Sequence, residues 1–275
     1  MGYAKVVEKP TSRSKWRRIV GKRYFILKRI LKWYFYNIKY SKFCEQTALP
    51  YSIFKHHSFL LRPLKNIDMV YQHNKVENLK IAITKLNGII IKPGETFSLW
   101  YLVGNPSKNK GYKLGLTLSS GSINYSYGGG LCQMGNLIYW MALHSPLTVV
   151  ERWRHSFDVF PDINRKLPFG SGATLSYNYI DLQLKNNTNQ NFQIMLWLDD
   201  ENLHGEIKSD KNINFTYEVY EKNHMIQTQI WGGYSRHNQI WRKIIDQKDS
   251  LLSDEIITEN HAIMMYNPLL TGREF

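Results

Sequence analysis

One cysteine of this sequence stands where a nucleophile could be activated. Three glycines, Gly128–Gly130, come just before Cys132, and apolar residues at helical spacing follow it. Glycines allow a tight turn with positive φ and a close approach of backbone. We therefore expect Cys132 in the first turn of a helix. There, free N–H groups and the helix dipole lower the pKa of a thiol and could receive an oxyanion.

A histidine downstream could act as the general base for this thiol. His155 lies within residues 147–160, which are rich in β-branched and aromatic side chains and predict a strand. A helix followed by an adjacent strand is a sensible way to bring Cys132 and His155 together. His144 is the rival base, but it lies about three turns along the helix of the cysteine, which is too far away on the same rod.

A third group would have to orient the histidine. Asp181 and Asp158 are both candidates, and Gln133 adds an amide donor beside the thiol. This order of cysteine, histidine and polar residue resembles the arrangement in papain-like and transglutaminase-like hydrolases, an analogy of arrangement only. The alternative is that Cys132 is a small buried side chain and His155 an ordinary strand residue.

The patterns along the chain predict an α+β fold. We expect a mixed or antiparallel sheet with the cysteine-bearing helix packed among strands, preceded by a basic amphipathic N-terminal helix. Besides the two helices already implied, a third is expected over 72–88, with Gly88 as its C-cap. The expected extended segments are 89–100, 116–127, 147–160, 172–188, a hairpin around 199–202, and 214–221. From 231 onward the chain is polar and shows no clear period.

The N-terminal segment carries most of the positive charge. The protein has 275 residues and a net charge of +14, and residues 1–43 hold 13 Lys and Arg against one acid, Glu8. A long helix is expected over 13–43, with large apolar residues on one stripe and basic residues mostly off it. Two interpretations stay open: the helix lies on an anionic membrane surface, or its apolar stripe docks on the rest of the protein.

Several classes of function are disfavoured. The chain after residue 43 is close to neutral, which argues against binding of nucleic acid. Two cysteines make neither a disulfide framework nor a zinc site built on cysteine pairs. The nine histidines show no paired ligand spacing, and Gly128–Gly130 lack the Lys-Ser/Thr of a phosphate-binding loop, so we expect no metal and no cofactor.

No signal peptide and no membrane-spanning helix is recognisable. The first residues are polar and basic, and no apolar run approaches the roughly 18 residues of a spanning helix. The sequence therefore predicts a protein that is cytoplasmic or peripheral at the cytoplasmic membrane.

Four motifs carry a resemblance to a known family. In this order, and over about residues 65–200, they resemble the VanW family, which is named from vancomycin-resistance gene clusters: KPGETFSLW (92–100), GGGLCQMGNLIYWMAL (128–143), VVERWRHS (149–156) and YIDLQLKNNT (179–188). We expect three parts: a basic amphipathic N-terminal helix over 1–45, a VanW domain over 46–210, and a C-terminal extension over 211–275.

The resemblance also implies an activity in peptidoglycan synthesis, that of an L,D-transpeptidase with a cysteine nucleophile. Such an enzyme attacks the carbonyl of the third residue of a donor stem peptide, expels the terminal D-alanine, and passes the acyl group to an amine of an acceptor stem. Carried over, Cys132 is the nucleophile and His155 the general base, assisted by Asp181. The oxyanion and substrate are then bound around Gly130, Gln133 and Ser156.

Two departures from the family pattern bear on this activity. Many members read Gly-x-Asp-Ala-Thr where this chain has Gly172 in place of the aspartate. A crosslinking enzyme also meets its substrate outside the membrane, whereas this sequence shows no export signal. The alternative function is therefore a non-catalytic accessory protein that binds peptidoglycan precursor, or a partner, at the cytoplasmic membrane face.

Overall fold

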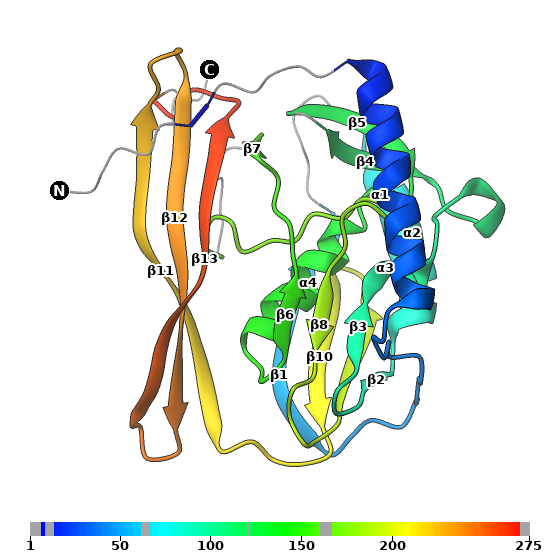
Figure 1. Cartoon of the computed structure of the whole chain (residues 1–275), viewed down its shortest axis with the longest axis vertical. Coiled ribbons are helices and arrows are strands. Elements are labelled where there is room, and N and C mark those ends of the chain that lie inside the picture. The colour runs from blue at the N-terminus through cyan, green and yellow to red at the C-terminus, as the bar shows by residue number, and fades with distance from the viewer. Residues whose placement is uncertain (1–6, 9–13, 62–66, 120, 160–166, 270–275) are drawn as a thin grey trace.

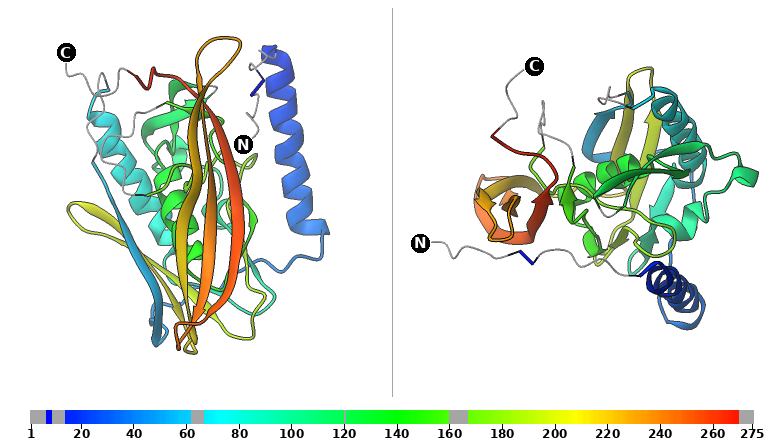
Figure 2. Two further views of the ribbon diagram at one scale, coloured as in Figure 1. Left: turned by 90° about the vertical axis from the view of Figure 1, so that its left-hand side faces the viewer. Right: turned by 90° about the horizontal axis from the view of Figure 1, so that it is seen from above.

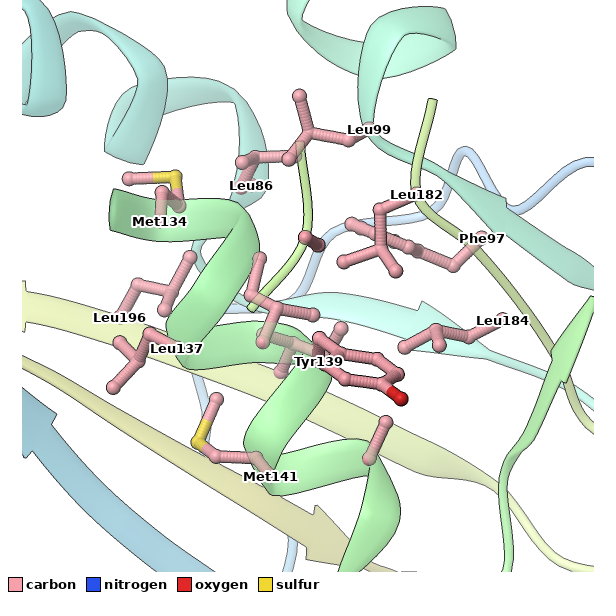
Figure 3. Close-up of a cluster of buried hydrophobic side chains, with 14 of the residues drawn as sticks. Leu86, Phe97, Leu99, Met134, Leu137, Tyr139, Met141, Leu182, Leu184 and Leu196 are labelled. Atoms are coloured by element: carbon pink, nitrogen blue, oxygen red, sulfur yellow. The ribbon is translucent and has the colours of Figure 1, made fainter. Parts of the chain in front are cut away.

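In the computed structural model, helix α4 (Cys132–Leu143) runs through the hydrophobic core, and nine of its 12 residues are buried. A helix that is apolar on nearly all sides must be covered on all sides. Figure 3 shows Met134, Leu137 and Tyr139 of this helix among leucines from other elements. The expected cysteine-bearing helix packed among strands is confirmed.

The structure describes residues 7–8, 14–61, 67–119, 121–159 and 167–269. Its other helices are α1 (Lys15–Phe35), α2 (Val70–Leu86), α3 (Leu99–Val103) and the 3-10 turn η1 (Lys108–Lys110). The strands are β1 (Tyr51–Phe59), β2 (Ile89–Ile91), β3 (Thr96–Ser98), β4 (Leu114–Ser119), β5 (Ser122–Tyr127), β6 (Thr148–Glu151), β7 (Phe157–Asp158), β8 (Gln183–Lys185), β9 (Phe192–Leu198), β10 (Asn202–Ser209), β11 (Phe215–Thr228), β12 (Tyr234–Asp246) and β13 (Leu251–Met264).

Two antiparallel sheets contact α4. The first has the order β1-β10-β9-β2 and the second β3-β8-β6, and α4 packs against β1, β10 and β6. In the first sheet Ile89, Ile194 and Ile207 stand side by side on three neighbouring strands, and all three are fully buried. Helix α2 packs on β9 and on the β4-β5 hairpin. These contacts make one core around the cysteine-bearing helix, and the α+β fold class is confirmed.

A separate sheet is formed by the C-terminal strands. Strands β11, β12 and β13 pair in antiparallel order, and the short β7 joins β13 in parallel. Figure 1 shows this strongly twisted sheet beside the part of the protein that contains α4. The lack of periodicity from 231 onward was therefore misleading, because residues 234–246 and 251–264 are strands. The predicted domain boundaries stay a prediction.

Two predicted strands are shorter in the structure. Within 147–160 only β6 and β7 are strands, and residues 152–156 between them are irregular, so His155 does not lie on a strand. Residue 160 lies outside the described residues. Within 172–188 only β8 is a strand, and Ser176 and Ile180 form a single bridge before it. The backbone groups of both segments hydrogen-bond in loops instead of a continuous ladder.

The N-terminal helix is shorter than predicted. Helix α1 ends at Phe35, and the chain then runs extended to a bridge between Tyr40 and Thr96. Residue 13 lies outside the described residues. Among the helices that the structure describes, none has the length and apolar character needed to cross a membrane.

Candidate functional site around Cys132

The glycine turn before Cys132 has the predicted conformation. Gly128 and Gly130 have φ of 77° and 92°, and Cys132 is the first residue of α4. Gly129 allows a close backbone approach, since a Cβ built there would lie 2.1 Å from the carbonyl carbon and oxygen of Gly115 on β4. The prediction of a tight glycine turn that opens the cysteine-bearing helix is confirmed.

A buried asparagine fixes this turn. The side-chain Nδ2 of Asn78 on α2 donates to the carbonyls of Gly129 at 2.9 Å and Lys113 at 3.1 Å. Its Oδ1 accepts from the Lys113 N–H at 2.7 Å. Asn78 is fully buried, so these bonds satisfy a side chain that would otherwise be costly in the core. Helix α2 thus holds the glycine turn against β4.

The thiol of Cys132 is held by the loop around Leu175. The Leu175 N–H donates to Sγ at 3.4 Å, and Sγ lies 3.8 Å from the Leu175 carbonyl oxygen. Burial raises the pKa of the thiol, while the N–H groups of Leu175 and of Cys132 itself lower it, and burial is the larger effect. The expected thiol of low pKa is therefore not present in this conformation, and deprotonation would need a base.

A second contact joins α4 to the same loop. Asn136 lies one helical turn after Cys132, and its Oδ1 accepts from the Ala173 N–H at 2.7 Å. A Cβ built on Gly172 would lie 2.7 Å from this Oδ1. A side chain at position 172 would therefore require the Asn136 amide to shift.

Arginine and backbone contacts hold the other side of the loop. Arg152 Nε donates to the Gly172 carbonyl at 2.8 Å, and its Nη2 donates to the Gly170 carbonyl. The Thr174 N–H donates to the Trp153 carbonyl at 2.7 Å. Because Leu175 contacts Cys132 and Thr174 contacts Trp153, the segment that carries His155 passes next to the loop that holds the thiol.

His155 is half-buried, and it makes no hydrogen bond to Cys132 or to any other residue that the structure describes. Burial lowers the pKa of its imidazole, and the positive charge of Arg154 lowers it further. The ring is therefore neutral near pH 7 and able to accept a proton. Its role as general base stays a prediction, because the hydrogen bond to the thiol is not formed here.

Asp181 is fully buried at another place in the core. Its carboxylate accepts four hydrogen bonds, from the Ser98 hydroxyl, the N–H groups of Trp100 and Leu182, and the side chain of Gln183. Burial raises its pKa to about 6, although the hydrogen bonds and Arg29 oppose this. None of these bonds reaches His155, so here Asp181 fixes the start of α3.

The remaining predicted site residues are placed apart from one another. Asp158 is buried on β7, where its Oδ2 accepts from the Tyr266 hydroxyl at 2.9 Å. Gln133 uses its Nε2 to donate to the Phe59 carbonyl at 2.8 Å and the Ser58 hydroxyl at 2.9 Å, at the end of β1. Ser156 is exposed, and its carbonyl accepts from β13.

Two backbone N–H groups at the cysteine have no carbonyl acceptor among the described residues, although the N–H of Cys132 acts on its own Sγ. In the part of the chain that the structure describes, no carbonyl accepts from the N–H of Gly130 or of Cys132. Both belong to the turn that opens α4, where unpaired N–H groups favour negative charge. Across the described ranges, no three His, Cys, Asp or Glu residues are grouped so that they could hold a metal, and Cys44 and Cys132 are free thiols.

Comparison with known proteins decides the family. The family model described as "VanW like protein" matches residues 74–208. The Vancomycin B-type resistance protein VanW of Enterococcus faecalis (strain ATCC 700802 / V583) is 42% identical over 180 residues, which cover 66% of this chain and 66% of that protein. The chain belongs to the VanW family. The match to the VanW model includes the glycine turn, Cys132 and His155, and it ends before β11.

A second relative is more distant. The Uncharacterized protein YoaR of Bacillus subtilis (strain 168) is 28% identical over 117 residues, covering 42% of this VanW chain and 37% of that protein. The chain therefore spans just under two thirds of the enterococcal relative and little more than a third of the second. No solved structure matches the chain.

Three residues of the site were not predicted from the sequence. They are Asn78, Asn136 and Arg152, which hold the glycine turn and the loop at residues 170–175. The four-residue spacing of Cys132 and Asn136 places both on one helix face, and this signal could have indicated Asn136. Asn78 and Arg152 contact backbone groups far away in sequence, for which no local pattern exists.

Proposed function

We propose that this VanW family member is a cysteine acyltransferase of L,D-transpeptidase type that acts on peptidoglycan stem peptides in vancomycin resistance. The observation that carries the proposal is the placement of Cys132 at the start of α4, behind a glycine turn. Among the described residues, no carbonyl accepts from the N–H groups of Gly130 and Cys132. The likeness to an enterococcal protein named for vancomycin resistance supports the cell-wall setting.

In the proposed first half-reaction, neutral His155 takes the proton of the Cys132 thiol, and the sulfur attacks the carbonyl carbon of the third stem residue. The C–N bond to the terminal D-alanine breaks, and the imidazolium returns the proton to the leaving amine. A thioester on Cys132 and free D-alanine result. The N–H groups of Gly130 and Cys132 would stabilise the oxyanion of the tetrahedral intermediate.

In the second half-reaction an acceptor amine attacks the thioester carbonyl. The C–S bond breaks, the new amide forms, and the proton of the amine passes through His155 back to the sulfur. The raised pKa of the Cys132 thiol and the lowered pKa of His155 mean that both groups start neutral. The reaction requires residues 152–156, an irregular segment that joins two short strands, to move so that the ring reaches the thiol.

The proposal is tested with purified full-length protein and a disaccharide-tetrapeptide. We expect crosslinked dimers and released D-alanine from the wild type, and neither from Cys132→Ala. Cys44→Ala is the matched control, because Cys44 is an exposed free thiol that forms a bridge with Ile89, and it should keep full activity. A wild type without product, or equal product from Cys132→Ala, would exclude the enzyme.

A specific observation favours a second candidate, an accessory protein that binds precursor without chemistry. The Cys132 thiol is not bonded to His155, and burial raises its pKa, as in an inert structural cysteine. The rate of iodoacetamide alkylation against pH separates the two candidates, measured on Cys44→Ala with and without the tetrapeptide. Alkylation that stays slow up to alkaline pH, with tetrapeptide bound equally by wild type and Cys132→Ala, would favour the accessory role.

A further inference from the structure

Helix α1 touches the rest of the protein with one face only. Arg29 makes two hydrogen bonds to the carboxylate of Glu151 at the end of β6, at 2.5 and 2.6 Å. On the same face the ring of Trp33 lies 5.3 Å from Tyr101, between centroids. No residue of α1 is fully buried. Figure 2 shows the helix on the outside of the protein. The contacts of Arg29 and Trp33 on this one face therefore hold α1 in its orientation.

The opposite face of α1 is a continuous apolar stripe. Its members recur at steps of three and four residues, which places them on one side of a helix. Their exposed fractions are 76% for Trp16, 61% for Val20, 59% for Tyr24, 57% for Leu27, 44% for Leu31, 74% for Tyr34 and 79% for Phe35. At 100° per residue, the centre of this stripe lies on the side of the helix away from Arg29. The stripe therefore does not dock on the rest of the protein.

The charge on α1 indicates what would cover this stripe. The helix contains eight Lys and Arg and no acidic residue. Arg17, Arg23 and Lys28 flank the stripe, and among the described residues only Arg29 of α1 forms an ion pair. A second copy of the chain would bring a like-charged helix against this one. An anionic bilayer surface instead satisfies both features, because it accepts apolar side chains and attracts unpaired cations.

We propose that α1 lies in the interface of an anionic lipid bilayer, with the Trp16–Phe35 stripe inserted among the acyl chains and the flanking basic side chains at the headgroups. Tryptophan and tyrosine at both ends of the stripe are the side chains that prefer this depth. The ion pair of Arg29 with Glu151 then holds the rest of the protein at the membrane surface. This inference does not depend on the proposed enzymatic activity.

The test is flotation of the full-length protein with vesicles of phosphatidylcholine alone or with about 30% phosphatidylglycerol. Phosphatidylglycerol is anionic and attracts Lys and Arg side chains to the bilayer surface. The test variant is Leu27→Gln with Leu31→Gln. The matched control is Leu251→Gln with Leu252→Gln, since these leucines are 58% and 56% exposed on β13. All four leucines are exposed, so both variants should fold, which thermal unfolding checks.

We expect the wild type and the control to float with the anionic vesicles at low salt and to be released by high salt, and neither to float with neutral vesicles. The Leu27→Gln, Leu31→Gln variant should bind at least about tenfold more weakly, because two side chains of the stripe are lost. Equal binding by this variant, or equal binding to neutral vesicles, would overturn the proposal. So would a lipid-free dimer that the variant dissociates, since a second copy would then cover the stripe.

Discussion

The backbone N–H of Ile263 on β13 donates to the carbonyl of Ser156 across 3.0 Å. The next residues, Phe157 and Asp158, pair with β13 as strand β7. The residue before His155, Arg154, donates from its guanidinium to the His261 carbonyl. Strand β13, which lies outside the residues matched by the family model, therefore holds the segment that carries His155.

Arg154 links this strand to the ionisation of His155. Replacement by alanine removes a cation that lowers the pKa of the His155 imidazole, so we expect this pKa to rise, though burial keeps it below the ordinary value. Loss of the charged hydrogen bond to His261 should also lower the free energy of unfolding by about 1.5–3 kcal/mol. An NMR titration of the His155 ring and urea unfolding measure the two effects. Arg154→Lys keeps the charge and should leave the pKa low; an unchanged pKa in Arg154→Ala would contradict the argument.

Asn136 should contribute to stability through one hydrogen bond. Asn136→Ala leaves the N–H of Ala173, a residue only 3% exposed, without its acceptor, which costs about 1–3 kcal/mol of unfolding free energy. Asn136→Asp keeps an acceptor oxygen and should lose less than half of that. Because the same loop holds the thiol through Leu175, Asn136→Ala should also speed alkylation of Cys132. A variant as stable and as slowly alkylated as the wild type would show that Asn136 does not position the loop.

Local chemistry made the glycine turn and α4 predictable. Positive φ at Gly128 and Gly130 is a property of glycine itself, and the apolar residues after Cys132 fix a buried helix by their spacing. The geometry around the thiol was less predictable, because it depends on distant groups. Gln133 follows Cys132 in sequence, yet its side-chain amide donates to Ser58 and Phe59 at the end of β1 and makes no hydrogen bond to the thiol.

The C-terminal sheet was missed for a different physical reason. Strand β12 buries Ser235, Arg236, His237 and Asn238 in succession, so it lacks the alternation of apolar and polar residues that indicates a strand. These side chains are satisfied by polar groups elsewhere in the fold, such as the Phe169 carbonyl that accepts from Asn238. Only the tertiary structure shows those partners. The stripe of α1 was recognised from its spacing, but its outward direction depends on the contact of Arg29 with Glu151.

Asp181 should make the stability of the protein depend on pH. Its pKa is raised to about 6 in the folded protein, against 3.8 ordinarily, so the folded state favours the protonated carboxyl. This contribution is fully present below about pH 4 and is lost as the pH rises to about 6, by at most about 3 kcal/mol. The Asn side chain of Asp181→Asn cannot ionise, so this variant should not lose stability as the pH rises from 4 to 6. Urea unfolding at pH 4 to 7 measures this.

Asp199→Asn is the control for this experiment. Asp199 is exposed, and its pKa is lowered to about 2 by hydrogen bonds from His204 and from backbone N–H groups. The contribution of Asp199 to the free energy of unfolding is therefore lost only at pH below about 4. Between pH 4 and 6, the free energy of unfolding of Asp199→Asn should change with pH as it does in the wild type. If the free energy of unfolding of Asp181→Asn still falls between pH 4 and 6 as in the wild type, burial of Asp181 does not cause this pH dependence.

Two glycine-to-alanine substitutions should change the free energy of unfolding in opposite directions. At Gly129 the new Cβ would stand 2.1 Å from the backbone of Gly115, which is fixed in β4 and cannot move like a side chain. We expect Gly129→Ala to lower the free energy of unfolding by about 1–3 kcal/mol and to disturb the turn before Cys132. At Gly21, inside α1, nothing lies within 4 Å, so alanine should favour the helix by about 0.5–1 kcal/mol. Urea unfolding and far-UV circular dichroism compare the two variants. A Gly129→Ala protein as stable as the wild type would mean that the close contact of Gly115 and Gly129 is not needed to open the cysteine-bearing helix.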